Sequence, residues 1–380
     1  MAKQIVIIGG SWVGLGLAHK LLKHSLPALP GVFKIVLIST SSHLYLNLAV
    51  PRAVVPGLIP DEKLGHPIAS SFAKYPKDSF EFIEGTAERF NDKTKEVSVK
   101  TASGDVTVAF DIAVIATGST YSGGLPFKGT GTFQQTLDDL HALQQRIANA
   151  NDIVIGGAGA TGVETAAEIA EEYHSKGKKV TIISATAGLL PAVREDVGKT
   201  AAKELEKFGV TVIGNSMVDS ATKSGDKTEL KLSTGRTLTT DLYISTVGVT
   251  PNVGFLPAHL LTSDGKLVVD EYQRVKGTTD IYAAGDVVDG QRKQLKFAED
   301  QTVYLAAALD MVLKKRQAKP FKQNNTVLLA ASLGRSKGVG ILGYFRLPSV
   351  MVWYVKGRYL ATDKLVSYSE GQKFITVGNM

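Results

Sequence analysis

A single stretch, IVIGGAGATGVETAAEIA at residues 153–170, sets the architecture expected for this chain. An apolar run is followed by a glycine-rich turn and then by apolar residues at helical spacing, which predicts a strand, a tight turn and a helix. The glycines complete the pattern G-x-G-x-x-G, which permits a sharp reversal, a close approach to a diphosphate and tight helix–strand packing. We therefore predict that Gly157, Gly159 and Gly162 hold a dinucleotide, the alternative being a tight turn without a ligand.

The chain opens with a similar stretch, IVIIGGSWVGLGLAHKLL at residues 5–22. Ser11 stands where the middle glycine would be, so a diphosphate must approach a slightly bulkier backbone. The loop residues expected to meet it are Gly9, Gly10, Ser11, Trp12, Val13 and Gly14. Two such loops in one chain indicate two dinucleotides, a flavin and a nicotinamide, with electron transfer between them.

The nucleotide preference depends on the end of the second strand of each unit. An acidic residue there usually binds a ribose hydroxyl, but here the positions are Ser39 and Ser184. A missing carboxylate leaves room for the 2′-phosphate of NADPH, although no arginine stands there to select it. NADH and NADPH therefore both stay open.

The two halves share a layout as well as a motif. Each begins with a strand–helix–strand unit and continues with alternating segments, an apolar strand and a glycine turn. We expect FEFIEGTAERF and EVSVKTASGDVTVAF to form antiparallel strands, a helix over 297–316, and a strand-rich α+β segment from about 325. The fold class expected is α/β, with two Rossmann-like dinucleotide-binding domains and a small α+β C-terminal domain.

Composition excludes several kinds of chemistry. The chain has 380 residues and no cysteine, which removes disulfides, thiolate metal sites, cysteine nucleophiles and dithiol catalysis. The seven histidines are scattered, so no metal site is expected. The net charge of +7 favours an anionic surface or a phosphorylated cofactor.

The termini and the hydropathy pattern bear on location. No signal-peptide pattern and no run of about 18 apolar residues is present. Ala2 stands where N-terminal myristoylation needs glycine. We expect a cytoplasmic protein that contacts a membrane, if at all, only peripherally.

Five motifs occur in a characteristic order. GGSWVG, IAVIATGS, GGAGATGVE, ISTVGVTPN and IYAAGDVVD together resemble the two-dinucleotide-binding flavoprotein oxidoreductases. LNLAVPRAVVPG and LLAASLGRSKGVGILGYF resemble the apoptosis-inducing-factor-like, ferroptosis-suppressor branch, which is similar to type II NADH dehydrogenases. The resemblance implies an FAD domain at 1–120 and 251–316, an NAD(P)H domain at 121–250 and a C-terminal domain at 317–380.

The resemblance also implies roles for residues near the flavin. Arg52 would lie near the flavin or its phosphates, and Ala87 would offer backbone to the adenine. Thr117 and Gly118 would form the turn between the two domains.

Three further residues carry polar roles by the same resemblance. Asp286, after Gly285 in AAGD, would bind the ribityl chain or contact a phosphate, and Glu164 would lie where flavin and nicotinamide meet. Lys296 would face the flavin pyrimidine edge and stabilise negative charge there. The alternatives are a solvated charge for Arg52 and Lys296, an N-cap for Asp286 and an ordinary first-turn acid for Glu164.

The expected reaction passes a hydride from NADH or NADPH to FAD and then two electrons to an acceptor. A quinone is the acceptor favoured by the resemblance, and an apolar passage for it could involve Phe297, Tyr304, Leu305, Leu347, Val350, Trp353 and Tyr354. The apolar and basic segment 344–360 suits shallow contact with an anionic membrane, although a hairpin or a subunit interface would have the same composition. Other small electron acceptors stay open, and the sequence does not fix the oligomeric state.

Two rival functions remain. The first is a soluble reductase that delivers electrons to a protein such as a ferredoxin. The second is a signalling or nucleic-acid-binding flavoprotein, supported by the run KKRQAKPFK at 314–322. That run lacks the interleaved aromatic residues of a single-strand binder, so no nucleic-acid partner is expected.

Overall fold

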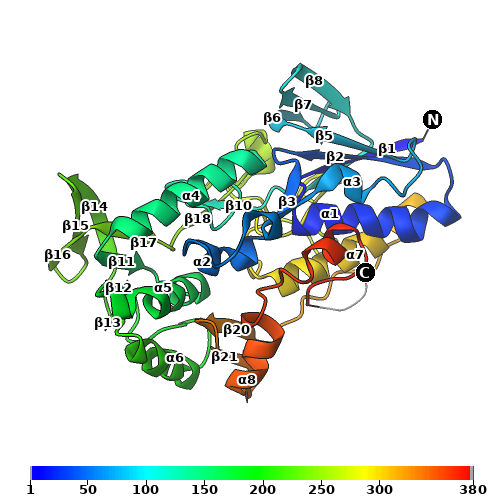
Figure 1. Cartoon of the computed structure of the whole chain (residues 1–380). Helices are drawn as coiled ribbons and strands as arrows, with labels where there is room; N and C mark the ends of the chain where they lie inside the picture. The colour runs from blue at the N-terminus through cyan, green and yellow to red at the C-terminus, as the bar shows by residue number, and fades with distance from the viewer. Residues whose placement is uncertain (1, 377–379) are drawn as a thin grey trace.

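The computed structural model describes residues 2–376 and residue 380 (Figure 1). Its first sheet is parallel, with the strand order β19-β9-β1-β2-β5. The strands are β1 (Lys3–Ile8), β2 (Phe33–Ser39), β5 (Phe80–Glu84), β9 (Ile112–Ile115) and β19 (Ile281–Ala283). The late strand β19 brings the chain back to the sheet that β1 began.

Both faces of this sheet are buried, because its strands are apolar on both sides: helices cover one face, and segments within 90–110 and 256–288 cover the other. Ile5 and Ile7 of β1 belong to one buried cluster, while Val6 and Ile8 belong to another. Helix α1 (Trp12–Lys20) follows β1 and packs against α7 (Leu295–Leu313). A continuous apolar run is therefore the signature of a strand buried on both faces.

The second sheet repeats the arrangement with the order β13-β12-β11-β17, also parallel. Its strands are β11 (Asp152–Gly156), β12 (Lys179–Ile183), β13 (Thr211–Ile213) and β17 (Leu242–Ser245). Helix α5 (Ala160–Tyr173) follows β11, while α4 (Phe133–Asn149) and α6 (Glu195–Lys207) complete the unit. The expected α/β fold with two Rossmann-like sheets is confirmed.

Each half also carries a three-stranded antiparallel sheet, as expected. The first consists of β6 (Thr86–Asn91), β7 (Glu96–Thr101) and β8 (Gly104–Ala109). The second consists of β14 (Val218–Ser224), β15 (Lys227–Leu232) and β16 (Thr237–Thr240). The prediction for residues 80–84 was wrong, because this segment is the parallel edge strand β5 and not an antiparallel strand.

The two halves are joined by a short antiparallel pair, β10 (Ser119–Tyr121) with β18 (Val249–Pro251). The chain leaves the first half through β10 and returns through β18. The glycine- and proline-rich stretch 121–131 begins at the end of the outgoing strand.

The C-terminal segment is part strand and part helix. It contains β20 (Leu328–Leu333), β21 (Lys337–Leu342) and β22 (Phe345–Leu347), followed by α8 (Ser349–Val352), a π-helical turn (Trp353–Gly357) and α9 (Leu365–Ser369). Strands β20 and β21 pack against α5 and α6 (Figure 1). The domain limits expected from the sequence stay predictions, and Met1 and residues 377–379 within them lie outside the described residues. Within residues 2–376, no helix has the length and apolar character needed to cross a bilayer.

Candidate functional site

The first glycine loop joins β1 to α1 and is packed so that glycine is obligatory at two positions. Gly9 has a φ of +119°, and a Cβ there would lie 2.2 Å from the carbonyl oxygen of Ala116. A Cβ on Gly14 would lie 1.9 Å from the carbonyl oxygen of Gly9, so the helix contacts the loop backbone directly. The exposed Ser11 is the N-cap of α1 but makes no side-chain cap, and no acidic residue occupies the first turn.

The second loop, between β11 and α5, has the same geometry with one informative difference. Gly157 has a φ of +109°, and a Cβ on Gly162 would lie 1.9 Å from the carbonyl oxygen of Gly157. A Cβ on Gly159, in contrast, would meet no atom within 4 Å. Packing within the described protein therefore requires Gly157 and Gly162, but it does not require Gly159.

These two loops fit the diphosphates of FAD and NAD(P)H. Backbone N–H groups at the start of α1 and α5 have no partner inside their helices, and the helix dipole favours negative charge at that end. Gly159 is the N-cap of α5, and the space that a Cβ would occupy there is open. The motif needs the backbone at this position to approach a phosphate. No acidic residue lies in the first turn of either helix to repel a phosphate.

The strand ends that usually carry a ribose-binding acid hold serines in the structure. The Ser184 side chain is buried, and its hydroxyl donates a 2.6 Å hydrogen bond to the carbonyl oxygen of Gly188. Ser39 accepts a hydrogen bond from the backbone N–H of Ser41. Neither position presents a carboxylate.

Asp286 lies beside the first loop. A Cβ on Gly285, whose φ is +82°, would sit 3.0 Å from the Val13 side chain, so the loop after β19 approaches the first glycine loop. The Asp286 carboxylate forms an ion pair with Lys128 and accepts a hydrogen bond from the Ser119 hydroxyl at 3.4 Å. Asp286 starts no helix, so the N-cap alternative does not apply.

Thr117 and Gly118 are fixed where the chain crosses between the halves. The Thr117 hydroxyl donates to the carbonyl oxygen of Asn252 at 2.7 Å, and the Asn252 side chain donates back to the Thr117 carbonyl at 2.9 Å. The backbone N–H of Asn252 donates to the Gly118 carbonyl at 3.0 Å. The outgoing and returning strands are thereby held together at the junction.

Arg52 is buried, and its guanidinium binds a carboxylate of the other half. Two of its nitrogens donate to Glu168 of α5 at 2.8–3.0 Å, and one also donates to the carbonyl oxygen of Gly334 at 3.2 Å. Burial raises the pKa of Glu168, and the ion pair with Arg52 opposes that rise. Arg52 is therefore not a solvated charge, and it joins three parts of the chain.

Glu164 is also buried and fully engaged. Its carboxylate accepts hydrogen bonds from the backbone N–H of Ser332 at 2.9 Å and from the Ser332 hydroxyl at 3.2 Å. The ammonium of Lys356 lies 2.6 Å from the same carboxylate. Glu164 is the fifth residue of α5, beyond its first turn, and is not an exposed acid, so the alternative of an ordinary first-turn acid does not apply.

Lys296 and Ala87 occupy less distinctive surroundings. Lys296 stands in the first turn of α7 and forms an ion pair with Asp300, one turn along the same helix. Ala87 lies in β6 opposite Val99 of β7 and is half-buried. The roles expected for both residues stay predictions.

Several partners of these residues could not be predicted from sequence patterns. Long stretches of chain separate these partners from the residues that they contact; the partners are Lys356, Ser332, Glu168 and Lys128. Tyr121 is another: its hydroxyl lies 3.1 Å from that of Thr161 in the first turn of α5, and burial raises its pKa. Periodicity and motif spacing do not reveal pairs of this kind.

Comparison with known proteins agrees with the geometry. Residues 3–302 match the family described as pyridine nucleotide-disulphide oxidoreductase. The oxidoreductase ptaL of Pestalotiopsis fici is 39% identical over 351 residues, covering 92% of this chain and 94% of ptaL. Ferroptosis suppressor protein 1 of Mus musculus is 27% identical over 381 residues, covering 97% of this chain and 95% of the relative.

Two solved structures have the same fold. NDH2 from Plasmodium falciparum in complex with NADH superposes with a TM-score of 0.79 at 14% identity, over 97% of this chain and 98% of NDH2. The sulfide:quinone oxidoreductase of Aquifex aeolicus gives a TM-score of 0.77 at 19% identity, over 97% and 92%. The chain therefore belongs to the pyridine nucleotide-disulphide oxidoreductase family, as an FAD-dependent member related to ferroptosis suppressor protein 1 that has no cysteine for a redox-active disulfide.

Proposed function

We propose that this protein is an NAD(P)H:quinone oxidoreductase. The balanced reaction is NAD(P)H + H⁺ + quinone → NAD(P)⁺ + quinol. FAD, when bound, supplies hydride acceptance and the transfer of two electrons. The observation that supports the proposal most is the pair of glycine loops, each ending a parallel strand and opening a helix with no acid in its first turn.

The chain's own residues would bind and orient the two coenzymes. The loop at Gly9–Gly14 would hold the diphosphate of FAD, and the loop at Gly157–Gly162 that of NAD(P)H. Lys128 and Asp286 would form one polar wall near the first loop, since they are paired beside it. Glu164, held by Ser332 and Lys356, would present a fixed carboxylate on the nucleotide-binding helix.

A quinone-type acceptor is supported by two observations. The chain lacks cysteine, so electrons have no disulfide to reduce within it. One structural neighbour is named a sulfide:quinone oxidoreductase. Of the residues expected to line an apolar passage, Phe297 and Leu305 are core residues, whereas Val350 and Tyr354 are exposed in the C-terminal segment.

Both nicotinamide nucleotides would serve as donors. The end of β12 presents Ser184, whose hydroxyl is turned toward Gly188, and no carboxylate that would repel a 2′-phosphate. We therefore expect kcat/KM for NADPH to lie within about tenfold of that for NADH, because neither a repelling acid nor a selecting arginine stands at this strand end.

The test is steady-state turnover of the purified FAD-loaded protein with NADH or NADPH and three acceptors. These are a short-chain ubiquinone, a ferredoxin and a soluble dye. Fast reduction of the quinone with one quinol formed per NAD(P)H would support the proposal. Turnover with ferredoxin but not with quinone would replace it with the protein-reductase alternative.

A further inference from the structure

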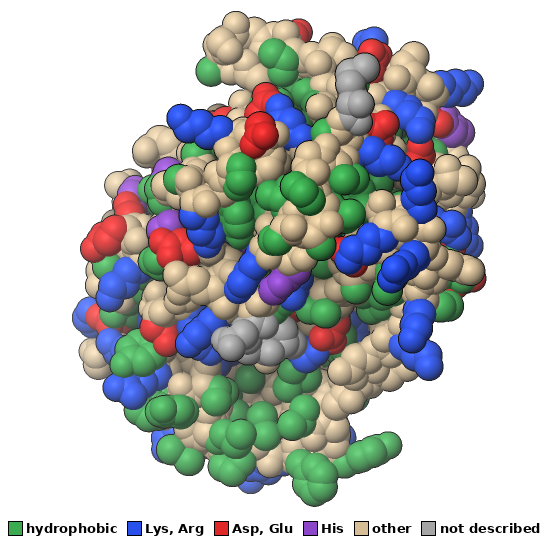
Figure 2. All heavy atoms as spheres, turned by 90° about the vertical axis from the view of Figure 1, so that its right-hand side faces the viewer, with side chains coloured by type: hydrophobic (Ala, Val, Ile, Leu, Met, Phe, Trp, Pro, Cys, Tyr) green, Lys and Arg blue, Asp and Glu red, His purple; other side chains and the backbone are tan. Residues whose placement is uncertain are grey.

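The last part of the chain returns to the helix that begins at the first glycine loop. Figure 1 places the C-terminus beside α1 and α7. Figure 2 shows this end of the molecule, over which lysine and arginine side chains are spread. Tyr368 of α9 is fully buried, and Phe374 is only 3% exposed. Both rings belong to the same buried cluster as the apolar residues of α1, so the end of the chain is packed into the first half.

Tyr368 reaches the first glycine loop itself. Its hydroxyl donates a hydrogen bond to the backbone carbonyl of Trp12, the first residue of α1. The two rings also meet edge to face, with their centroids 4.9 Å apart. The indole N–H of Trp12 in turn donates to the side chain of Asn47 at 2.9 Å. The first turn of α1 is therefore held by a side chain that lies 356 residues further along the chain.

Helix α1 makes room for this contact at Gly16. Glycine inside a helix costs stability relative to alanine. A Cβ on Gly16 would lie 3.0 Å from the Tyr368 hydroxyl and 3.6 Å from the ring of Phe374. The glycine therefore allows Tyr368 to come close enough to bind the Trp12 carbonyl.

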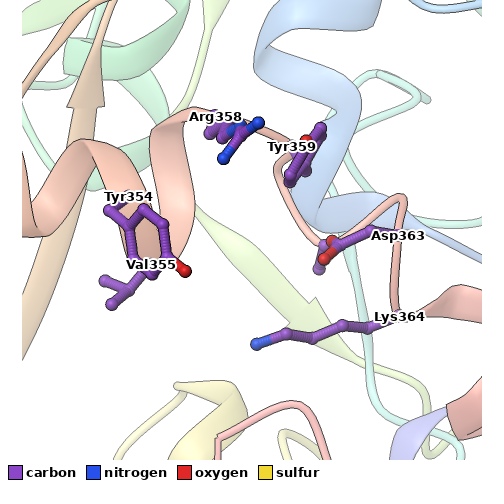
Figure 3. A pocket seen from close by; sticks show the side chains of 7 residues that line it. Tyr354, Val355, Arg358, Tyr359, Asp363 and Lys364 are labelled. Atoms are coloured by element: carbon purple, nitrogen blue, oxygen red, sulfur yellow. The ribbon is translucent and has the colours of Figure 1, made fainter.

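The stretch of chain that leads into α9 does not by itself fix the position of Tyr368. A hollow of about 240 Å³ lies beside this stretch, and Figure 3 shows Tyr354 on one side of it and Lys364 on the other. Leu360 and Ala361 have φ values of +49° and +65°, a left-handed conformation that residues with a side chain adopt at a cost. Such a connection persists only where contacts further along the chain hold it.

Contacts on the C-terminal side of Tyr368 provide that restraint. The carbonyl oxygen of Ser369 accepts a hydrogen bond from the Nε2–H of His19, in the last turn of α1, at 2.7 Å. The buried carboxylate of Glu299 in α7 accepts from the backbone N–H groups of residues 375–376 at 2.7 and 3.0 Å. The end of the chain is therefore fixed against both ends of α1 and against α7.

The Tyr368 contact acts on a group that the first loop would offer to FAD. The carbonyl of Trp12 and the N–H of Val13 belong to one planar peptide unit. Val13 lies in the first turn of α1, where an N–H has no partner inside the helix and is free to bind a phosphate. A hydrogen bond to the carbonyl oxygen fixes the plane of this unit and polarises it, which makes its N–H a stronger donor.

We propose that Tyr368 is a positioning residue for FAD. It orients the Val13 N–H at the first glycine loop, and the C-terminal segment thereby determines how long FAD stays bound. The inference rests on the proposed binding of FAD at this loop. It holds for either nicotinamide nucleotide and for any electron acceptor.

Release of FAD from Tyr368→Phe tests the proposal, because this change keeps the ring and removes only the hydroxyl. The FAD-loaded proteins are diluted to nanomolar concentration, and the rise in fluorescence of free FAD is followed over time. We expect release about fivefold faster than from the wild type, since the loss of one hydrogen bond typically corresponds to about that factor. The KM for NAD(P)H, which would bind at the second loop, should not change.

The matched control is Tyr45→Phe. Tyr45 is also buried, and its hydroxyl also donates to a backbone carbonyl, that of Pro126 at 2.9 Å, which lies outside the first glycine loop. Both variants should lower the thermal stability of the FAD-free protein to a similar extent. Only Tyr368→Phe should accelerate the release of FAD, whereas a purely structural role of its hydroxyl would change stability alone.

Gly16→Ala tests the same contact from the side of the helix. The added methyl group would displace the Tyr368 hydroxyl, so the release of FAD should accelerate in the wild-type background. In the Tyr368→Phe background the same change should add little, because the hydroxyl is already absent. The Thr302 side chain, 3.2 Å from the added Cβ, is met in both backgrounds, so its effect cancels in the comparison.

Two results would overturn the inference while leaving the proposed function in place. The first is release of FAD from Tyr368→Phe at the wild-type rate, and the second is equally fast release from Tyr45→Phe. In both cases the wild type holds FAD and is reduced by NAD(P)H. A wild-type protein that takes up no FAD would instead overturn the inference and the proposed function together.

Discussion

The ammonium of Lys356 lies 2.6 Å from the buried carboxylate of Glu164, and this contact joins the C-terminal segment to the nucleotide-binding helix. Glu168 and Glu171, further along α5, also connect this helix to the C-terminal segment. Glu168 binds Arg52, which in turn donates to Gly334, and Glu171 accepts from the backbone N–H of Arg335 at 2.7 Å. Helix α5, which follows the second glycine loop, is therefore held to the C-terminal segment by three carboxylates on successive turns.

Removing the cation from the first of these contacts should destabilise the protein. In Lys356→Met the buried Glu164 carboxylate keeps only Ser332 as a partner, which we expect to cost about 2 kcal/mol of the free energy of unfolding. Urea denaturation of the FAD-loaded protein at pH 7 measures it. Lys356→Arg should retain most of the stability. An unchanged urea midpoint in Lys356→Met would show that the contact contributes nothing to the free energy of unfolding.

The Arg52–Glu168 pair should show strong energetic coupling. Both side chains are buried, so Arg52→Met alone leaves an unpaired carboxylate and should cost about 3–5 kcal/mol. The double variant Arg52→Met/Glu168→Leu should cost clearly less than the sum of the single changes. The exposed pair Lys199–Glu195 on α6 is the control, with an expected coupling below about 0.5 kcal/mol. Equal couplings for the two pairs would rule out a special role for the buried one.

His19 should make stability depend on pH. It is fully buried, its Nε2–H donates to the carbonyl oxygen of Ser369, and its Nδ1 accepts from the Tyr75 hydroxyl. Burial lowers its pKa from 6.5 to about 3. Below pH 6.5 His19 is protonated in the unfolded chain but stays neutral in the folded chain. The free energy of unfolding therefore decreases as the pH falls from 6.5 toward 3. The expected slope is about 1.4 kcal/mol per pH unit.

His19→Gln separates this effect from other titrating groups. The difference in unfolding free energy between wild type and variant should shrink steadily from pH 7 to pH 4.5, measured in urea at each pH. Parallel profiles for the two proteins would mean that His19 is not the group responsible.

The second glycine loop offers a matched pair of substitutions. Gly159→Ala places a methyl group in open space, so stability should stay within about 1 kcal/mol, while the KM for NAD(P)H should rise about tenfold or more. Gly162→Ala meets the Gly157 carbonyl and should lower stability by more than about 2 kcal/mol. An unchanged KM in Gly159→Ala would mean that no diphosphate approaches this loop.

Local signals in the sequence predicted the local structure well. The stretch 153–170 forms a strand, turn and helix as expected, because apolar periodicity and glycine geometry act over a few residues. Phe80–Glu84 shows the limit, since alternation indicates a strand but not its partner or direction. The C-terminal segment shows another, because its composition indicated strands and helices together but not that the residues after Leu347 form the helical turns.

The candidate site was predictable in its glycines and not in its contacts. Gly9, Gly14, Gly157 and Gly162 have the tight packing that the motif requires. The partners of Arg52 and Glu164 lie 116 or more residues away along the chain, and only the packed fold brings them together. Burial of these charges follows from that packing, which no local pattern encodes.

Anaerobic titration of the purified protein decides whether electrons pass from a nicotinamide nucleotide through FAD to a quinone. We expect a yellow protein whose absorbance at about 450 nm is bleached by one equivalent of NADH or NADPH and restored by one equivalent of short-chain ubiquinone. A protein that takes up no FAD, or whose absorbance responds to neither nucleotide, would contradict it.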